Sequence, residues 1–196
     1  MSVNETANGS TQSRIIEKAL FLFKSRGFMD VTVKDICEEC GITRGAFYYY
    51  YKTKDEILDD IYVASDYITT HEFRDIVQED NYIEQFYKLH SVYLERTLEV
   101  GPEIMGQVLK RYIDKGTKLA APQDVAVFDM YVFLIQKAQD AGQILCTAPA
   151  SVLADAAVHL SNSLGLIWCS KRGAFDYKKE FRKVQDALFM LNIPQN

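Results

Sequence analysis

Residues that break helices are scarce in this chain. Only 10 glycines and 4 prolines interrupt 196 residues, and 48% of the residues are apolar. A fold built from many short strands needs more turn residues than this, whereas long helices need few. Segments with strand-like alternation between turn signals are missing as well. The sequence therefore predicts an all-α fold.

Long apolar runs are also missing. The longest, such as 131–135, are far shorter than the ~20 residues that a membrane-spanning helix needs. Residues 1–12 are rich in Ser, Thr, Asn and Gln and lack the basic flank and apolar stretch of a signal peptide, so we expect a disordered lead. Without an export signal, the 4 cysteines are expected to be reduced thiols of a cytoplasmic protein.

Catalytic and metal-binding motifs are missing too, so we expect no enzymatic activity, no cofactor and no metal. The sequence has no phosphate loop, no nucleophile elbow and no H-E-x-x-H, and its 3 histidines are dispersed. Asp155 and His159 share a helical face, and we interpret them as a hydrogen-bonded pair at an interface rather than a metal or acid–base pair. Cys37 and Cys40 form a C-x-x-C without a second pair at ligand spacing. We interpret them as small buried residues, with a redox or zinc sensor as the alternative.

Apolar residues recur with helical spacing near the N-terminus. Ile15, Ala19 and Phe23 share one face of a first helix that starts near residue 13, and Gly27 follows its last turn. The stretch 53–56 has the pattern of a complete capping box and predicts the start of a fourth helix, which continues to about Phe73. Further helices are predicted over 82–98, 102–113, 123–141, 150–170 and 175–191.

Residues 32–51 carry the pattern of a helix-turn-helix. Thr32 and Thr43 are suited to cap two short helices, and Gly41 between them allows a tight turn. The apolar residues expected to lock these helices together are Ile36, Ile42 and Phe47. The residues left to face a partner are Thr43, Arg44, Tyr48 and Tyr49.

This stretch resembles the DNA-binding domain of the TetR family of regulators. The resemblance is carried by Ala19, Phe23, Gly27, Phe28, Thr32, Ile36, Gly41, Ile42, Thr43, Gly45, Tyr48, Tyr51, Lys54 and Leu58. Beyond about residue 60, only the helical layout and the joint 140–144 are similar to the family. The departures are cysteine at 37 and 40, where alanine is usual, and tyrosine at 50 and 51, where histidine and phenylalanine are common. The resemblance implies a three-helix DNA-binding domain over 13–58 and a larger helical domain for ligand binding and dimerisation over 59–196.

The resemblance also implies contacts with double-stranded DNA at a palindromic operator. Arg44, at the front of the recognition helix, is the best candidate for a bidentate guanine contact, which is worth ~1–3 kcal/mol of discrimination. Thr32 at a helix N-terminus, with Lys34 and Lys54, is expected to bind phosphates. Tyr51 is expected to pack inside. The full set of expected DNA-binding residues is Thr32, Lys34, Thr43, Arg44, Gly45, Ala46, Tyr48, Tyr49, Tyr50 and Lys54.

The net charge of −5 argues against a nucleic-acid partner, because many DNA-binding domains are strongly basic. The distribution of charge weakens this objection. Residues 11–54 contain 8 basic and 5 acidic side chains, which leaves this segment at +3. We therefore expect salt-dependent DNA binding with few phosphate contacts per subunit, a number that dimerisation doubles.

The C-terminal helices are expected to hold an effector and to contact a second subunit. The resemblance implies a ligand cavity among them, for which the candidates are Tyr67, His71, Tyr93, Tyr112, Tyr131 and Trp168. Apolar stripes on the last two helices predict a four-helix dimer interface. Its candidate residues are Leu153, Ala157, Leu160, Leu164, Phe181, Val184 and Leu188.

These features together predict a homodimeric regulator of transcription that a small-molecule effector releases from DNA, with repression as the default and activation as an open alternative. Two other classes of protein remain as alternatives. A DNA-binding protein that signals through a protein partner would have a filled core without a pocket. An enzyme or redox protein on a helical bundle would bind zinc or flavin.

Overall fold

The computed structural model describes residues 3–63, 68–116 and 125–191, and helices are the regular elements of all three stretches. The all-α fold expected from the sequence is confirmed. The elements are α1 (Val3–Arg26), α2 (Val33–Cys40), α3 (Arg44–Tyr50), the 3-10 helix η1 (Lys54–Glu56), α4 (Ile57–Val63), α5 (Thr70–Val77), α6 (Tyr82–Val100), α7 (Pro102–Lys115), α8 (Val125–Asp140), α9 (Ala150–Ser170) and α10 (Tyr177–Phe189).

Two helix starts differ from the prediction. Residues 3–12, expected to be a disordered lead, form the beginning of α1. The side-chain amide of Gln12 donates to the carboxylate of Asp60 on α4 at 2.8 Å, so this part of α1 is tied to another helix. Once the packed turns of a helix exist, each further residue extends it at little cost, and weak helix formers then follow.

The predicted fourth helix is two helices. The side chain of Thr53 accepts no capping hydrogen bond. Instead, the side chain of Glu56 accepts a hydrogen bond from the backbone N–H of Lys52 at 2.7 Å, and this helical segment begins with the short 3-10 helix η1. Phe73 lies on the separate helix α5, which has its own capping box between Thr69 and Glu72. The capping-box prediction for 53–56 was therefore wrong, and so was the single helix reaching Phe73.

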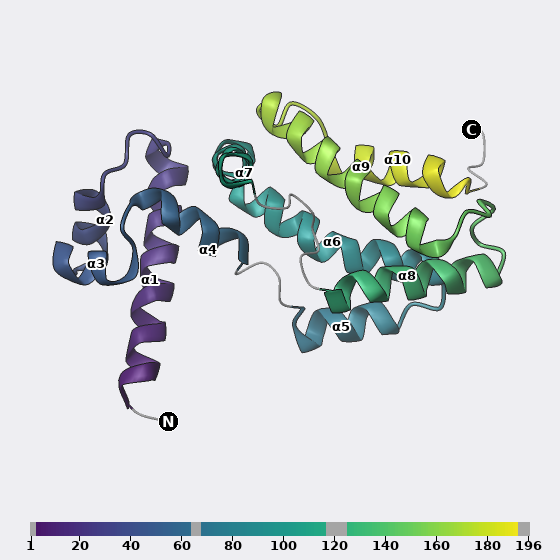
Figure 1. The fold of residues 1–196 in the computed structure, drawn as a ribbon, viewed down its shortest axis with the longest axis horizontal. Helices are drawn as coiled ribbons and strands as arrows, with labels where there is room; N and C mark the ends of the chain where they lie inside the picture. The colour runs from purple at the N-terminus through teal and green to yellow at the C-terminus, as the bar shows by residue number, and fades with distance from the viewer. Residues whose placement is uncertain (1–2, 64–67, 117–124, 192–196) are drawn as a thin grey trace.

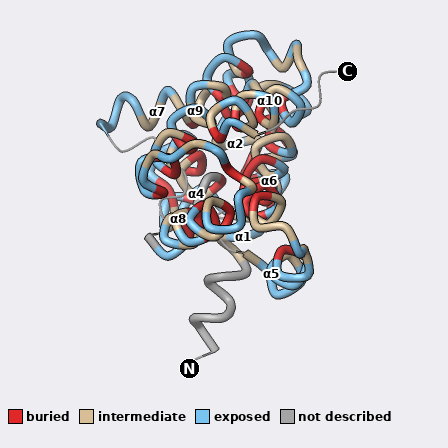
Figure 2. The backbone as a smooth tube through the Cα atoms, turned by 90° about the vertical axis from the view of Figure 1, so that its right-hand side faces the viewer, coloured by how far each residue is buried: buried red, intermediate tan, exposed pale blue. Residues whose placement is uncertain are grey.

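Two apolar cores hold the helices together (Figures 1 and 2). The N-terminal core contains Phe23 and Phe47 from the first three helices, and α7 adds Ile104 and Val108 to it. The second core lies among α5, α6, α8, α9 and α10, around the fully buried ring of Tyr131. Helix α7 therefore completes the core of the N-terminal helices, although it lies about 50 residues beyond them in the sequence.

Helix α9 is more apolar than the sequence analysis recognised. Its length and composition would allow it to cross a membrane. Its most apolar 18-residue stretch has a mean hydropathy of 1.3, and a third of this stretch is buried inside the structure. It packs against α7, α8 and α10. The core helix of a folded domain passes the same test, so this is weak evidence for a membrane span. Its exposed apolar side chains are Val152, Leu160, Leu166 and Ile167.

Candidate nucleic-acid interface

The turn between α2 and α3 forms as the sequence predicts. Gly41 adopts φ 63° and ψ 37°, a left-handed conformation that strains other residues, and its N–H bonds to carbonyls of the preceding turn. Thr43 then caps α3 by accepting a hydrogen bond from the N–H of Ala46 at 3.2 Å. Ile36 and Phe47 are buried, so they lock α2 and α3 together as expected. The two helices form a helix-turn-helix.

Helix α3 buries one side and exposes the other. Phe47 is fully buried, and Tyr51 is buried with its hydroxyl donating to the carboxylate of Asp60 at 2.5 Å. Burial and this carboxylate raise the pKa of Tyr51, so the phenol keeps its proton. Tyr48 is 54% exposed and Tyr49 is 73% exposed. The inward position of Tyr51 is confirmed, and the run of four tyrosines is divided between core and surface.

The leading end of α3 faces solvent. Thr43, Arg44 and Gly45 are exposed, and Ala46 is half-buried. No carboxylate pairs with Arg44 within the stretches that the structure describes. A methyl group added at Gly45 would meet only the hydroxyl of Thr43, at 3.8 Å, so no side chain covers the helix backbone at this position. An unpaired guanidinium on a smooth helix end is suited to a bidentate contact with a base edge.

The phosphate contact expected of Thr32 is not supported. Its hydroxyl accepts from the N–H of Asp35 at 3.2 Å and donates to the Asp35 carboxylate at 2.5 Å, while its backbone N–H donates to the same carboxylate at 2.8 Å. The hydrogen bonds from Thr32 lower the pKa of Asp35. The hydroxyl and the backbone N–H of Thr32, which were expected to bind a phosphate, thus bind the carboxylate of Asp35. Thr32 is the N-cap of α2.

Lys54 also has a different role from the one expected. Its ammonium group donates to the backbone carbonyls of Phe28, Met29 and Val31, at 2.6, 3.3 and 2.8 Å, and lies 4.5 Å from the centroid of the Phe28 ring. An ammonium has three protons. All three have acceptors within the domain, so Lys54 holds the loop between α1 and α2 in place and has no proton left for a phosphate.

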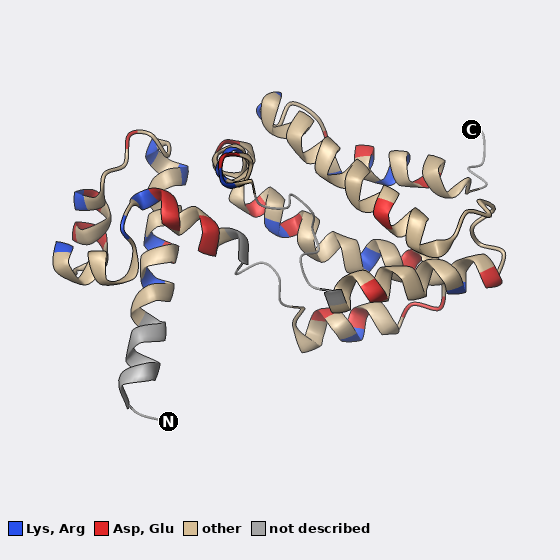
Figure 3. Ribbon diagram, viewed as in Figure 1, with Lys and Arg blue, Asp and Glu red and all other residues tan. Residues whose placement is uncertain are grey.

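Other basic groups remain on the surface of the N-terminal helices (Figure 3). Lys34 pairs only with Glu38, with 3.6 Å between the charged atoms, and both side chains are 64% exposed. Such a pair contributes little to stability, so a phosphate can replace Glu38 at small cost. Tyr50 is half-buried, with its ring edge-on to Tyr49 at 5.0 Å. The exposed basic residues are Arg14, Lys24, Arg26, Lys34, Arg44 and Lys52.

Comparison with known proteins identifies this arrangement. A family model described as bacterial regulatory proteins of the tetR family matches residues 15–61, the segment that forms α1 to α4. These residues therefore match the DNA-binding region of the TetR family. The transcriptional regulator YerO of Bacillus subtilis is 43% identical over 47 residues, which are 24% of this chain and 16% of that protein. UidR of Escherichia coli, another helix-turn-helix regulator, is 23% identical over 144 residues, 71% of this chain and 70% of UidR.

Solved TetR-family structures share the fold along nearly the whole chain. One is FadR of Thermus thermophilus, a repressor solved in complex with lauroyl-CoA. The match includes 94% of this chain and 96% of the FadR chain, with 18% sequence identity and a TM-score of 0.61. Another is NalD of Pseudomonas aeruginosa, a repressor of a multidrug efflux pump. The match includes 94% of this chain and 96% of the NalD chain, with 15% sequence identity and a TM-score of 0.54. The family is one of transcriptional regulators and not of enzymes, and its members bind DNA and small-molecule ligands and act as dimers.

The C-terminal domain contains a small cavity of about 60 Å³, partly open to solvent, among α6, α7, α9 and α10. Its polar lining residues are His90, Tyr93, Thr97, Ser161, Asn162 and Tyr177. Its apolar lining residues are Leu94, Met105, Leu109 and Gly165. His90 bonds through Nε2 to the hydroxyl of Ser161 at 2.8 Å. Burial lowers the pKa of His90 to about 3, so the imidazole is neutral.

The predicted effector residues are divided by the structure. Tyr93 lines the cavity, whereas Tyr131 and Trp168 stack behind two residues that line it, Tyr131 on His90 and Trp168 on Tyr177. Tyr112 packs against the N-terminal core instead. Tyr67 lies outside the described residues. The aromatic composition thus located the region of the cavity without identifying its lining.

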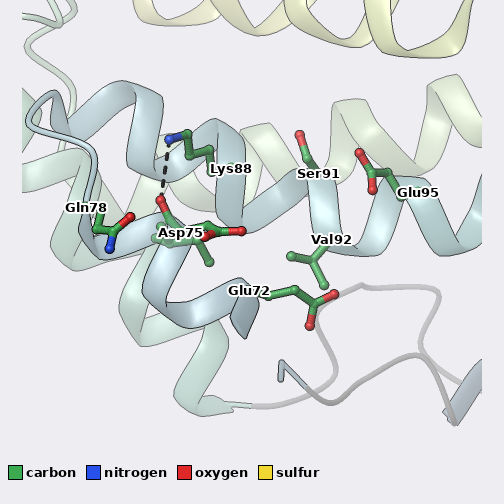
Figure 4. Close-up of a pocket in the computed structure, with 8 residues that line it drawn as sticks. Glu72, Asp75, Gln78, Lys88, Ser91, Val92 and Glu95 are labelled. Carbon is green, nitrogen blue, oxygen red and sulfur yellow. Dashed lines mark hydrogen bonds between the residues drawn. The ribbon is translucent and has the colours of Figure 1, made fainter. Parts of the chain in front are cut away.

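His71 does not line the cavity, because its side chain is 81% exposed and pairs with Asp75 on the surface of α5. A wide groove of about 650 Å³ runs between α5 and α6 beside it (Figure 4). The acidic side chains there have partners: Glu72 pairs with Arg96, and Glu95 with Lys178. We interpret the groove as a solvated surface.

Three predicted dimer residues belong to the subunit's own core. Leu153, Ala157 and Phe181 are 0–3% exposed. An apolar stripe indicates burial but does not say which surface covers it, and here the neighbouring helices cover it. Leu164, Val184 and Leu188 are half-buried, and Leu160 is 37% exposed. Of the predicted set, Leu160 has the most exposed side chain.

The two cysteines of the C-x-x-C are buried in the N-terminal core, and all four cysteines are unbridged. Burial raises the pKa of both Cys37 and Cys40, which disfavours the reactive thiolate. Across the described residues, no cluster of histidine, cysteine and acidic side chains could hold a metal ion. The geometry is that of small packing residues beneath the turn.

Proposed function

We propose that the protein is a cytoplasmic, non-enzymatic homodimeric repressor that binds a palindromic DNA operator and releases it when a small molecule binds the C-terminal domain. The observation that carries this proposal is the leading end of α3. It presents an exposed, unpaired Arg44 beside Gly45, with Tyr48 and Tyr49 exposed on the next turn. The remaining interface consists of Thr43, Ala46, Tyr50 and Lys34.

A two-fold dimer supports binding to a palindrome, because two recognition helices must lie about 34–36 Å apart to enter successive major grooves. We assign the dimer contact to the exposed apolar face of α9, where Val152, Leu160 and Ile167 follow each other at helical spacing. Covering these side chains with the same face of a second subunit removes them from water.

Helix α7 supports a link between effector and DNA. Met105 and Leu109 line the cavity on one side and pack against the N-terminal core on the other. Two residues after Leu109, Arg111 forms an ion pair with Asp59 on α4, with 2.8 Å between Nε and Oδ1. A ligand that shifts α7 therefore shifts the helices that carry α3.

One observation favours a second candidate. The cavity of about 60 Å³ is small, as expected for a regulator that responds to a protein partner instead of a ligand. A screen of small molecules for operator release separates the two candidates, because a protein-controlled regulator responds to none of them.

The test of DNA binding begins with selection of fragments from a random DNA library by the purified protein. Affinity for the selected sequence is then measured by fluorescence anisotropy for the wild type, Arg44→Ala and the control Arg74→Ala, which removes an exposed arginine on α5. We expect at least tenfold weaker binding and relaxed sequence preference for Arg44→Ala alone. Equal affinity of all three proteins, or no selected sequence, contradicts the proposal.

A further inference from the structure

The cavity in the C-terminal domain is lined mainly by neutral polar side chains. Six of its lining residues carry hydroxyl, amide or imidazole groups, and none of the lining residues that the structure describes is an aspartate, glutamate, lysine or arginine. Polar groups in a buried pocket fix the orientation and chemical class of a ligand, while the apolar wall supplies contact area. The lining therefore carries information about the effector.

We propose that the effector is an uncharged molecule with a compact apolar body and one hydroxyl, carbonyl or amide group, which hydrogen-bonds beside His90 and Ser161. This inference rests on the proposed function, in which the cavity is the effector site.

The absence of charge from the lining excludes the main alternatives. A carboxylate or phosphate that enters a buried site loses its hydration, and a basic partner must replace it. Among the described lining residues, the base is His90, and it stays neutral because burial lowers its pKa to about 3. An ammonium would need a carboxylate, and the lining has none. Burial raises the pKa of Tyr177 to about 12, so this phenol is neutral as well.

The hydrogen bonds of His90 leave one position open. Its ring is 4% exposed and is stacked between Phe181 and Tyr131, with centroids at 4.4 and 5.5 Å. Nε2 is paired with Ser161, but Nδ1 has no hydrogen-bond partner within the described parts of the chain. In a neutral imidazole, one nitrogen donates and the other accepts. Whichever tautomer is present, a hydroxyl satisfies Nδ1, and a carbonyl does so when Nδ1 carries the proton.

The size of the cavity links this ligand to DNA release. A cavity of roughly 150 Å³ holds benzene, so a ring-sized effector that lies wholly inside a cavity of about 60 Å³ has to move one of its walls. Helix α7 provides one wall, and its residues Met105 and Leu109 also pack against the N-terminal core. We therefore expect ligand binding to displace α7 and, through it, α4.

The test uses three aromatic probes of similar size that differ in charge: benzyl alcohol, benzoate and benzylammonium. Each is titrated into the full-length protein by calorimetry and into its operator complex by anisotropy. We expect benzyl alcohol to bind at least tenfold more tightly than either ion and to release the operator. Ser161→Ala should weaken the binding of benzyl alcohol at least fivefold. The control Ser91→Ala, which changes the α5–α6 groove and not the cavity, should leave it unchanged.

A second variant protects the test against misfolding. Leu109→Phe adds volume at the α7 wall and should abolish binding of benzyl alcohol while the protein still unfolds cooperatively on heating. Binding of benzoate or benzylammonium as tight as that of benzyl alcohol overturns the inference. So does a protein that binds its operator but none of the three probes. Failure of operator binding before any probe is added contradicts the proposed function itself, so the two failures are distinguishable.

Discussion

Arg111 on α7 and Asp59 on α4 form a bidentate ion pair. The guanidinium donates from Nε to Oδ1 and from Nη2 to Oδ2, both at 2.8 Å, and Lys115 adds a third contact to the same carboxylate at 2.7 Å. Burial alone would raise the pKa of Asp59, but the hydrogen bonds from Arg111 and Lys115 outweigh it and lower this pKa. The pair joins the wall of the cavity to the helix that follows the recognition helix.

Replacing Asp59 should uncouple effector from operator. Asp59→Asn keeps the size of the side chain but loses the charge that pairs with Arg111 and Lys115, so we expect about 1–3 kcal/mol lower stability and a smaller change in operator affinity when the effector is added. Urea unfolding and anisotropy with and without effector measure the two effects. Lys110→Gln, an exposed neighbour of Arg111, is the control. An unchanged response in Asp59→Asn would show that coupling takes another route.

A methyl group at Gly45 should separate folding from DNA binding. The added carbon of Gly45→Ala meets only the Thr43 hydroxyl at 3.8 Å, so the free protein should gain about 0.5–1 kcal/mol from the helix preference of alanine. In the proposed complex, the same methyl group would lie between the helix backbone and the major groove, so we expect at least tenfold weaker operator binding. Thermal unfolding and anisotropy give the two values. Undiminished affinity would remove Gly45 from the interface.

Lys34 and Lys54 should respond in opposite ways. Lys34→Ala should leave stability unchanged and reduce the slope of log affinity against log salt by about one for each phosphate that the lysine neutralises, or about two per dimer. Lys54→Met removes the bonds to the carbonyls of Phe28, Met29 and Val31, and should cost about 1–3 kcal/mol of stability without changing the salt slope. A reduced salt slope in folded Lys54→Met would restore its phosphate role.

His90 should make the protein sensitive to acid. Its pKa is about 3 in the folded protein and near 6.5 in the unfolded chain, so between these values the unfolded chain binds more protons. The free energy of unfolding should therefore fall as the pH is lowered from 6.5 towards 3, by up to about 1.4 kcal/mol per pH unit from this residue. Urea unfolding between pH 4.5 and 6.5 should show a flatter profile for His90→Phe than for the exposed control His71→Gln. Parallel profiles would mean that His90 is not buried as a neutral base.

A charge on α9 should separate the subunits. Leu160→Glu places a carboxylate on the exposed apolar face, and burying it against a second subunit is costly. We expect a monomer in sedimentation velocity and weaker operator binding. The control Phe73→Glu makes the same kind of change on α5, where Phe73 is 48% exposed, and should remain a dimer. If Leu160→Glu stays dimeric, the contact lies on another face.

Features that depend on neighbours in the sequence were predictable from the residues alone. The turn at Gly41, the cap at Thr43, the burial of Phe47 and the limits of α9 all follow from backbone preference and helical spacing over a few residues. The match of residues 15–61 to the TetR family model rests on the same local pattern. For these features, the folded chain adds exact positions but does not change the interpretation.

Only the tertiary structure decided which surfaces and groups meet. Lys54 reaches carbonyls more than 20 residues away, and Asp35 occupies the groups of Thr32 that a phosphate would need. Leu153 and Phe181 look like interface residues in the sequence, yet helices of the same subunit cover them. Helical spacing says that a side chain is buried, but its partner depends on how distant helices cross, and no local pattern encodes that.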